Sequence, residues 1–124
     1  MPSPTEITVS QLSRLIGLPN APVLIDVRTE EDFAADPRLI PGSVRRPADQ
    51  PASWASVCKD KSAVIVCRSG GRLSQGAAAW LRHEGVAAET LEGGFAGWSS
   101  AGQPLLRTEK LPQRDAEGRT VWVT

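Results

Sequence analysis

Cys67 is the residue of this sequence best suited to chemistry, because it opens a loop that contains two glycines. The apolar run Ala63–Cys67 predicts a buried strand and the pattern after Arg72 predicts a helix, so Cys67 lies at a strand's carboxyl end. Open α/β sheets bind ligands at that edge. Gly70 and Gly71 let successive N–H groups converge on an anion, and the helix start adds its positive dipole end. We therefore expect Cys67 to be a thiolate nucleophile.

Two arginines add positive charge to this loop. Arg68 and Arg72 can hold an anionic substrate beside the thiolate, so that one positive pocket is expected on a neutral surface. The alternative for Cys67 is a buried, inert thiol. The second cysteine, Cys58, lies close to Lys59 and Lys61, and no glycine-containing loop follows it. We expect Cys58 to have a packing role, with a resolving thiol as the alternative.

The elements that position this loop alternate between strands and helices, which predicts an α/β domain with a parallel sheet. The expected strands are Val23–Val27, Ala63–Cys67 and Ala87–Leu91, with Val44 in a strand of one or two residues. The expected helices begin at the capping box of Thr8 and Gln11, at Thr29 before Glu30–Ala35, at Ser53–Val57, at Arg72 and near Phe95. In the helix after Arg72, the buried stripe is expected to be Leu73, Ala77, Trp80 and Leu81.

Composition narrows the class of protein. The chain has 124 residues, which is one domain's worth, and 14 basic residues balance 14 acidic ones. That neutrality argues against a nucleic-acid binder and gives no basic patch for a membrane. No segment resembles a signal peptide or a bilayer span, so we expect a cytoplasmic protein with reduced thiols. Its 2 cysteines are too few for a disulfide framework.

The loop from Cys67 to Arg72 resembles the active-site loop of the rhodanese (sulfurtransferase) family. The family's other motifs follow along the chain in order. They are Asp26-Val27-Arg28, Glu31-Asp32-Phe33, Ile40-Pro41-Gly42-Ser43 and Gly93-Gly94-Phe95 through Gly97-Trp98. The resemblance covers about residues 5–106 and implies a rhodanese-like parallel sheet flanked by helices on both faces.

The resemblance implies transfer of sulfane sulfur through Cys67. Its thiolate would attack the outer sulfur of thiosulfate or of a persulfide, and cyanide, glutathione or a protein cysteine would then take the sulfur. The resulting persulfide would be held by the active-site loop, which is Arg68, Ser69, Gly70, Gly71, Arg72 and Leu73. No cofactor or metal is implied, and the single histidine, His83, is expected on the surface.

Other classes of function stay open at this point. One is a regulatory module that senses persulfide or oxidant for an attached domain, which also needs a reactive thiol. Another is a cysteine phosphatase or arsenate reductase. Cysteine phosphatases carry a C-x5-R loop sized for phosphate, whereas Arg72 follows Cys67 here as C-x4-R, a tighter loop suited to one sulfur atom.

The sequence departs from the family at two positions. Leu73 replaces the usual serine after the loop arginine, which is expected to remove a hydroxyl near the helix start and to make the entrance more apolar. Leu39 replaces a histidine that many members carry, a change expected to be peripheral. Either change could alter the acceptor or the rate.

Asp26 and Arg28 are the expected supporting residues. An acid at the end of a buried strand needs hydrogen bonds, so Asp26 is expected to accept them from backbone N–H groups of a neighbouring loop. Arg28 is expected to pair with a helix carboxylate such as Glu31 or to flank the site. The aromatic residues expected in the core are Phe95, Trp98 and Trp54, with a pocket-lining role as the alternative for Trp54.

The sequence predicts a rhodanese domain over residues 1–106 and a separate tail over residues 107–124. The polar segment Arg107–Arg119 has the composition of a linker, and Thr120–Thr124 is β-prone. We expect the native protein to continue past Thr124, with a natural edge strand as the alternative. Glu117–Thr124 also resembles the start of a chromate-resistance-type domain, which would make this chain the sulfurtransferase half of a larger stress protein.

Overall fold

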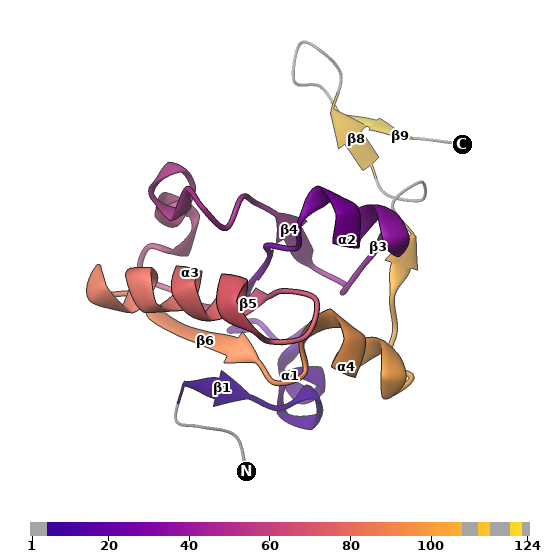
Figure 1. Cartoon of the computed structure of the whole chain (residues 1–124), viewed down its shortest axis with the longest axis horizontal. Helices are drawn as coiled ribbons and strands as arrows, with labels where there is room; N and C mark the ends of the chain where they lie inside the picture. Colours follow the sequence, from indigo (N-terminus) through magenta and orange to yellow (C-terminus); the bar gives the residue numbers. More distant parts are fainter. Residues whose placement is uncertain (1–4, 108–111, 115–119, 123–124) are drawn as a thin grey trace.

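The structure is a computed structural model, and it describes residues 5–107, 112–114 and 120–122. Helices and strands alternate along most of the chain (Figure 1). The strands are β1 Glu6–Ile7, β2 Val23–Asp26, β3 Arg38–Leu39, β4 Ser43–Arg45, β5 Ser62–Val66, β6 Ala87–Leu91, β7 Leu106–Arg107, β8 Pro112–Arg114 and β9 Thr120–Trp122. The helices are α1 Val9–Leu15, α2 Glu30–Ala35, α3 Arg72–His83 and α4 Gly94–Ser100, with 3-10 turns η1 Pro51–Ser53 and η2 Ala55–Cys58.

A parallel sheet forms the centre of the domain. Its strand order is β1-β6-β5-β2-β4, and every adjacent pair is parallel. The central strands β2 and β5 are buried on both faces, as their continuous apolar sequences require. The predicted α/β fold with a parallel sheet is therefore confirmed.

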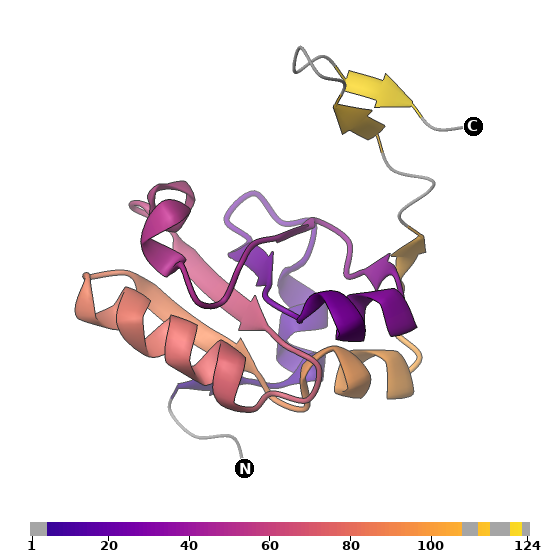
Figure 2. The ribbon, with the colours of Figure 1, turned by 45° about the horizontal axis from the view of Figure 1, so that its top comes forward.

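Helices cover both faces of the sheet, and each face has its own apolar core. On one face, α3 and η2 pack against β2 and β5 through Ile25, Ile65, Ala77, Leu81 and Cys58. On the other face, α1 and α4 contribute Leu12, Phe95 and Trp98 to a second cluster. Figure 2 shows α3 lying along one side of the sheet, with α1 on the opposite side.

Local capping explains where the first two helices begin. Thr8 and Gln11 form the predicted capping box at α1, since each side chain bonds to the other residue's backbone N–H. The hydroxyl of Thr29 accepts from the N–H of Asp32 and caps α2, whose first turn is acidic. These caps fix the start of each short helix beside the sheet.

The buried face of α3 differs from the predicted stripe. Ser74, Ala77 and Leu81 are buried, whereas Leu73 is 38% exposed. The prediction that Leu73 packs in the core is wrong, whereas the predicted Ala77 and Leu81 are buried and Trp80 packs partly buried against the same core. The buried face includes Ser74 and Ala78 in place of Leu73. Ser74 occupies a buried position on this helix, where its hydroxyl contacts the Cys67 sulfur.

The short strands β1, β3, β7 and β8 were not predicted from the sequence, whereas β9 falls within the run Thr120–Thr124 that was predicted to be β-prone. β1 pairs with β6, β3 pairs with β7 and β8 pairs with β9. Residues 112–114 therefore form a strand within a segment predicted as a linker. No helix in the described part of the chain is long and apolar enough to cross a membrane.

Candidate active site

The Cys67 thiol lies at the carboxyl end of β5, at the point where the chain turns into α3. Its side chain is buried, with only 5% of the residue exposed. The N–H of Gly71, the N-cap residue of α3, donates to the sulfur at 3.1 Å. No side chain caps this helix, so the sulfur accepts a hydrogen bond at the helix's positive end. This geometry favours a negative charge on sulfur.

The start of α4 holds the first carbonyl groups of the loop. The N–H of Phe95 donates to the oxygen of Cys67, and the N–H of Ala96 donates to the oxygen of Arg68, both at 2.8 Å. In a trans peptide the carbonyl and the following N–H point in opposite directions, and none of the described residues is joined by a cis peptide bond. The N–H groups of Arg68 and Ser69 therefore point away from α4.

Gln75 holds the second half of the loop in the same manner. Its side-chain amide donates to the oxygen of Gly70 at 3.0 Å, and its backbone N–H donates to the oxygen of Gly71 at 3.1 Å. These carbonyl dipoles are thus turned toward donors rather than toward the thiol. A loop arranged in this way presents positive partial charges to a bound anion.

Glycine is required where the loop meets the start of α4. Gly94 has a φ of +60°, and a Cβ there would lie 2.5 Å from the oxygen of Cys67 and from the nitrogen of Gly70. A Cβ on Gly70 would in turn lie 3.0 Å from the oxygen of Leu91. The Gly93–Gly94 turn therefore supports the cysteine loop through direct contact between backbones.

Ser74 is a site residue that the sequence analysis missed. Its hydroxyl lies 3.1 Å from the Cys67 sulfur and 3.2 Å from the oxygen of Gly71, and the residue is fully buried. Leu73 lacks the serine hydroxyl that family members usually carry at that position, but the next residue, Ser74, supplies a hydroxyl at the helix start. The sequence could have indicated this role. Ser74 follows the nucleophile by seven residues in an alanine-rich helix, and a serine hydroxyl that is buried in such a helix needs a hydrogen-bond partner.

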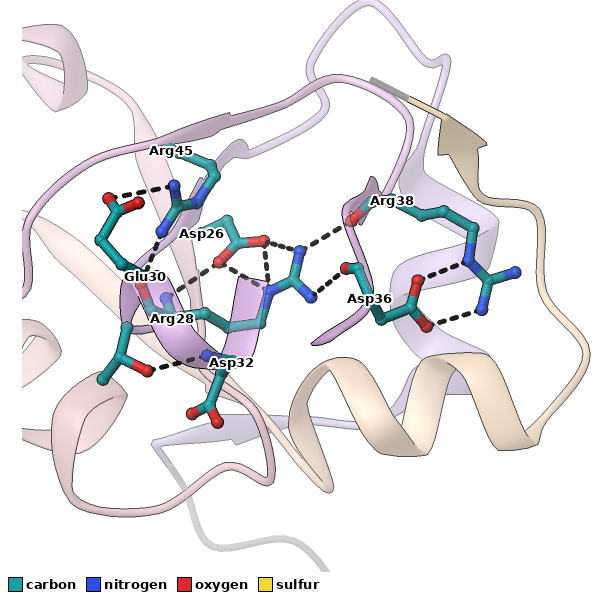
Figure 3. Close-up of polar contacts among 8 residues, drawn as sticks. Asp26, Arg28, Glu30, Asp32, Asp36, Arg38 and Arg45 are labelled. Carbon is teal, nitrogen blue, oxygen red and sulfur yellow. Dashed lines mark hydrogen bonds and ion pairs between the residues drawn. The ribbon is translucent and has the colours of Figure 1, made fainter. Parts of the chain in front are cut away.

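Asp26, the last residue of β2, and Arg28, in the loop that follows β2, form a buried ion pair (Figure 3). Both oxygens of Asp26 accept from Arg28, and Oδ1 also accepts from the Arg28 backbone N–H at 2.9 Å. The Arg28 side chain is 1% exposed. Asp26 accepts from a backbone N–H, but this N–H belongs to Arg28, two residues further on, and not to a neighbouring loop as predicted. The predicted pairing of Arg28 with Glu31 is wrong, since Arg28 pairs with Asp26. Asp26 and Arg28 are two residues apart in extended chain and so share one face.

The Arg28 guanidinium contacts residues from elements that are far apart in sequence. It donates to the backbone oxygens of Asp36 and Arg38 and lies 3.8 Å from the centre of the Phe95 ring. Phe95 is the residue whose N–H holds the Cys67 carbonyl, so the ion pair and the cysteine loop meet at α4. Hydrogen bonding from Arg38 also lowers the pKa of Asp36 below its usual range.

The two loop arginines do not share a cavity. Arg68 is exposed, lies 3.9 Å from Asp32, and lines a cavity of about 300 Å³ with Phe95. A larger cavity, of about 490 Å³, is lined by Leu73 and by the segments after β2 and β4. Arg72 is exposed and lines neither of these cavities. The prediction that Arg68 and Arg72 together form one positive pocket is therefore wrong.

The remaining residues singled out from the sequence lie away from the thiol's hydrogen-bond partners. Cys58 is fully buried, and this burial raises the pKa of its thiol although Lys61 opposes the shift. Trp54 is also in the core, where its indole N–H donates to the oxygen of Pro47. His83 is exposed at the end of α3. Within the residues that the structure describes, no cluster of His, Cys, Asp and Glu side chains is suited to a metal.

The fold and the site together define a class: an α/β protein with a thiol held at a strand end by a glycine loop and a helix N-terminus. Within that class the chain belongs to the family described as the Rhodanese-like domain, which matches residues 8–101. The family resemblance and the rhodanese-like fold inferred from the sequence are thus confirmed.

Individual relatives agree with this assignment. The chain is 34% identical to Bacillus subtilis YtwF over 100 residues, which is 80% of this chain and 94% of that protein. It is 32% identical over 106 residues to a protein of Allochromatium vinosum named Sulfurtransferase, covering 84% and 96% of the two chains. The crystal structure of thiosulfate sulfurtransferase from Pseudomonas aeruginosa matches with a TM-score of 0.72 and 25% identity, over 89% of this chain and 21% of that one.

Proposed function

We propose that this protein is a sulfurtransferase that carries sulfane sulfur as a Cys67 persulfide. In the first half-reaction the Cys67 thiolate attacks the outer sulfur of thiosulfate. The S–S bond of the donor breaks, a Cys67–S–S⁻ persulfide forms, and sulfite leaves with the bonding electron pair. A thiolate or cyanide then attacks the outer sulfur of the persulfide and restores the Cys67 thiolate, so the sulfur atom moves without a net oxidant.

One observation supports the proposal most strongly: the environment of the Cys67 sulfur. The sulfur is close to the Gly71 N–H and the Ser74 hydroxyl, and the loop carbonyls bond to α4 and Gln75. Such a site stabilises a thiolate and a persulfide anion by preorganised donors and needs no general base for a donor whose leaving group is sulfite. The names of the A. vinosum and P. aeruginosa relatives support the same chemistry.

Steady-state turnover distinguishes this function from persulfide sensing. The folded, reduced protein is mixed with thiosulfate and cyanide, and thiocyanate is measured over time. We expect many turnovers per molecule in the wild type and in Cys58→Ser, and none in Cys67→Ser. A single loading event without release to cyanide or small thiols would instead indicate a sensor, and Cys67-dependent hydrolysis of an aryl phosphate would indicate a phosphatase.

A further inference from the structure

The N–H that bonds to the Cys67 sulfur belongs to the peptide between Gly70 and Gly71. The nitrogen of Gly71 lies 3.1 Å from the sulfur. The carbonyl group of the same peptide is that of Gly70, and its oxygen accepts from the side-chain amide of Gln75 at 3.0 Å. Because the carbonyl and the N–H of a trans peptide point in opposite directions, the Gln75 amide, this peptide and the sulfur form one continuous chain of hydrogen bonds.

This peptide has more freedom to turn over than most. Rotation of a peptide plane changes ψ of the residue before it and φ of the residue after it, and both of these residues are glycines, for which little of φ/ψ space is forbidden. Gly70 already has a φ of +78°, and a Cβ on Gly71 would meet no atom within 4 Å. The backbone and the packing beside Gly71 therefore do little to fix the direction of the N–H.

The direction of the peptide matters because its two ends carry opposite partial charges. In the observed orientation the Gly71 N–H faces the sulfur and stabilises a negative charge there. In the reverse orientation the carbonyl oxygen of Gly70 would face the sulfur and repel a thiolate or a persulfide anion. The site therefore needs a contact that selects one orientation.

The Gln75 side chain supplies this contact. Among the residues that the structure describes, Gln75 is the one donor found for the oxygen of Gly70. The oxygens of Cys67 and Arg68 are held differently, by backbone N–H groups of α4. Gln75 lies near the start of α3, so the helix that begins at the loop also places this amide. A donor at the carbonyl polarises the peptide and strengthens the hydrogen bond that its N–H makes.

We infer that Gln75 is a positioning residue of the sulfur site, which holds the Gly70–Gly71 peptide with its N–H directed at the Cys67 sulfur. Gln75 acts on the sulfur through this peptide. The effect on catalysis rests on the proposed function, because the anion that the N–H stabilises is the thiolate or the persulfide of the transfer reaction. The effect on the peptide does not depend on turnover, so the two effects can be measured separately.

The kinetic experiment removes the donor from residue 75 and keeps the shape of the side chain. Gln75→Met has a similar length and helix propensity but cannot donate. With cyanide as acceptor, we expect kcat/KM for thiosulfate to fall by about two- to ten-fold, as for the loss of one hydrogen bond. Gln50→Met is the matched control, since Gln50 is exposed and its side chain does not cap η1. An unchanged kcat/KM in Gln75→Met would overturn the inference.

A second pair of variants separates the donor from other effects of the substitution. Gln75→Lys keeps a donor at the end of a long side chain, so it should recover most of the rate that Gln75→Met loses. Ala79→Lys in the Gln75→Met protein adds the same charge about one turn further along α3, at an exposed position that is remote from the loop, and should recover none of it. Equal recovery by both lysines, or by neither, would contradict the role given to the donor.

Amide exchange reports the orientation of the peptide in the resting, reduced protein. Hydrogen–deuterium exchange of the Gly71 N–H, followed by NMR, should be about two- to ten-fold faster in Gln75→Met, while exchange at Ala78 in the middle of α3 should match the wild type. Unchanged exchange at Gly71, or equal acceleration at Gly71 and Ala78, would overturn the inference even in a protein that transfers sulfur. Faster exchange at Gly71 alone, in a protein that forms no persulfide, would support the positioning role and refute the proposed function.

Discussion

Replacing Gly94 by alanine tests whether the Gly93–Gly94 turn supports the cysteine loop. The added Cβ would lie 2.5 Å from the oxygen of Cys67 and 2.8 Å from the nitrogen of Ser69. These are backbone atoms and cannot be avoided by rotating a side chain. The loop must therefore move away by roughly 1 Å to restore ordinary van der Waals separation.

The size of the effect follows from the bonds that this movement breaks. The hydrogen bonds from Phe95 and Ala96 to the loop are 2.8 Å long, and lengthening them by about 1 Å removes both, at about 1 kcal/mol each. Alanine in the left-handed conformation adds about 1–2 kcal/mol. The expected loss of stability is about 3–4 kcal/mol, a large share of the roughly 5–15 kcal/mol that holds a small domain together.

Gly102→Ala is the matched control, because Gly102 also has a positive φ of +72° but has open space around it. It therefore carries the conformational cost without the clash, and the difference between the two variants, about 2 kcal/mol, isolates the contact between the turn and the loop. Urea unfolding, followed by the fluorescence of the buried Trp54 and Trp98, measures both free energies. If both variants lose the same stability, the turn does not support the loop as described.

Three further perturbations test the ion pair, the buried hydroxyl and the second thiol. Asp26→Asn leaves the buried Arg28 without a counter-charge and should cost about 3–5 kcal/mol of unfolding free energy, whereas Asp36→Asn in the partly exposed pair should cost no more than about 1 kcal/mol. Equal losses in urea unfolding would argue against the role given to the buried pair. Ser74→Ala removes the hydroxyl that lies 3.1 Å from the Cys67 sulfur and that donates to the Gly71 oxygen, so the rate of thiocyanate formation should fall by about two- to ten-fold; Ser56→Ala serves as the control, and an unchanged rate would show that the hydroxyl does not support the active thiol. Because burial raises the pKa of Cys58 in the folded protein, the unfolded chain ionises first, and wild-type stability should fall faster than that of Cys58→Ala as pH rises above about 9; parallel stability curves would contradict this.

The central fold could be predicted from local sequence patterns. Val23–Val27 and Ala63–Cys67 are continuous apolar runs, and the caps at Thr8 and Thr29 mark helix starts within single turns of chain. Two-residue strands such as β1 could not be predicted in this way, because Glu6–Ile7 becomes a strand only by pairing with β6, far along the chain.

The position of the Cys67 thiol could also be predicted from the sequence. The hydrogen-bond partners of the thiol and of its loop were predicted less well. A cysteine, two glycines and a helix start are adjacent in sequence, so their cradle is a local structure. The loop's carbonyl partners come from α4, and only the three-dimensional fold brings Phe95 beside Cys67. Ser74 was missed because an alternative stripe through Leu73 fits the helical period equally well, and the choice between them depends on the polar contact with Cys67.

Mass spectrometry of the protein after thiosulfate treatment tests the central claim most directly. The folded, reduced protein is incubated with thiosulfate, freed of small molecules and digested without reductant. We expect one added sulfur atom on the peptide that contains Cys67, release of an equal amount of sulfite, and the same result in Cys58→Ser. An unmodified Cys67 peptide with thiosulfate and with an organic persulfide, or sulfur found only on Cys58, would contradict it.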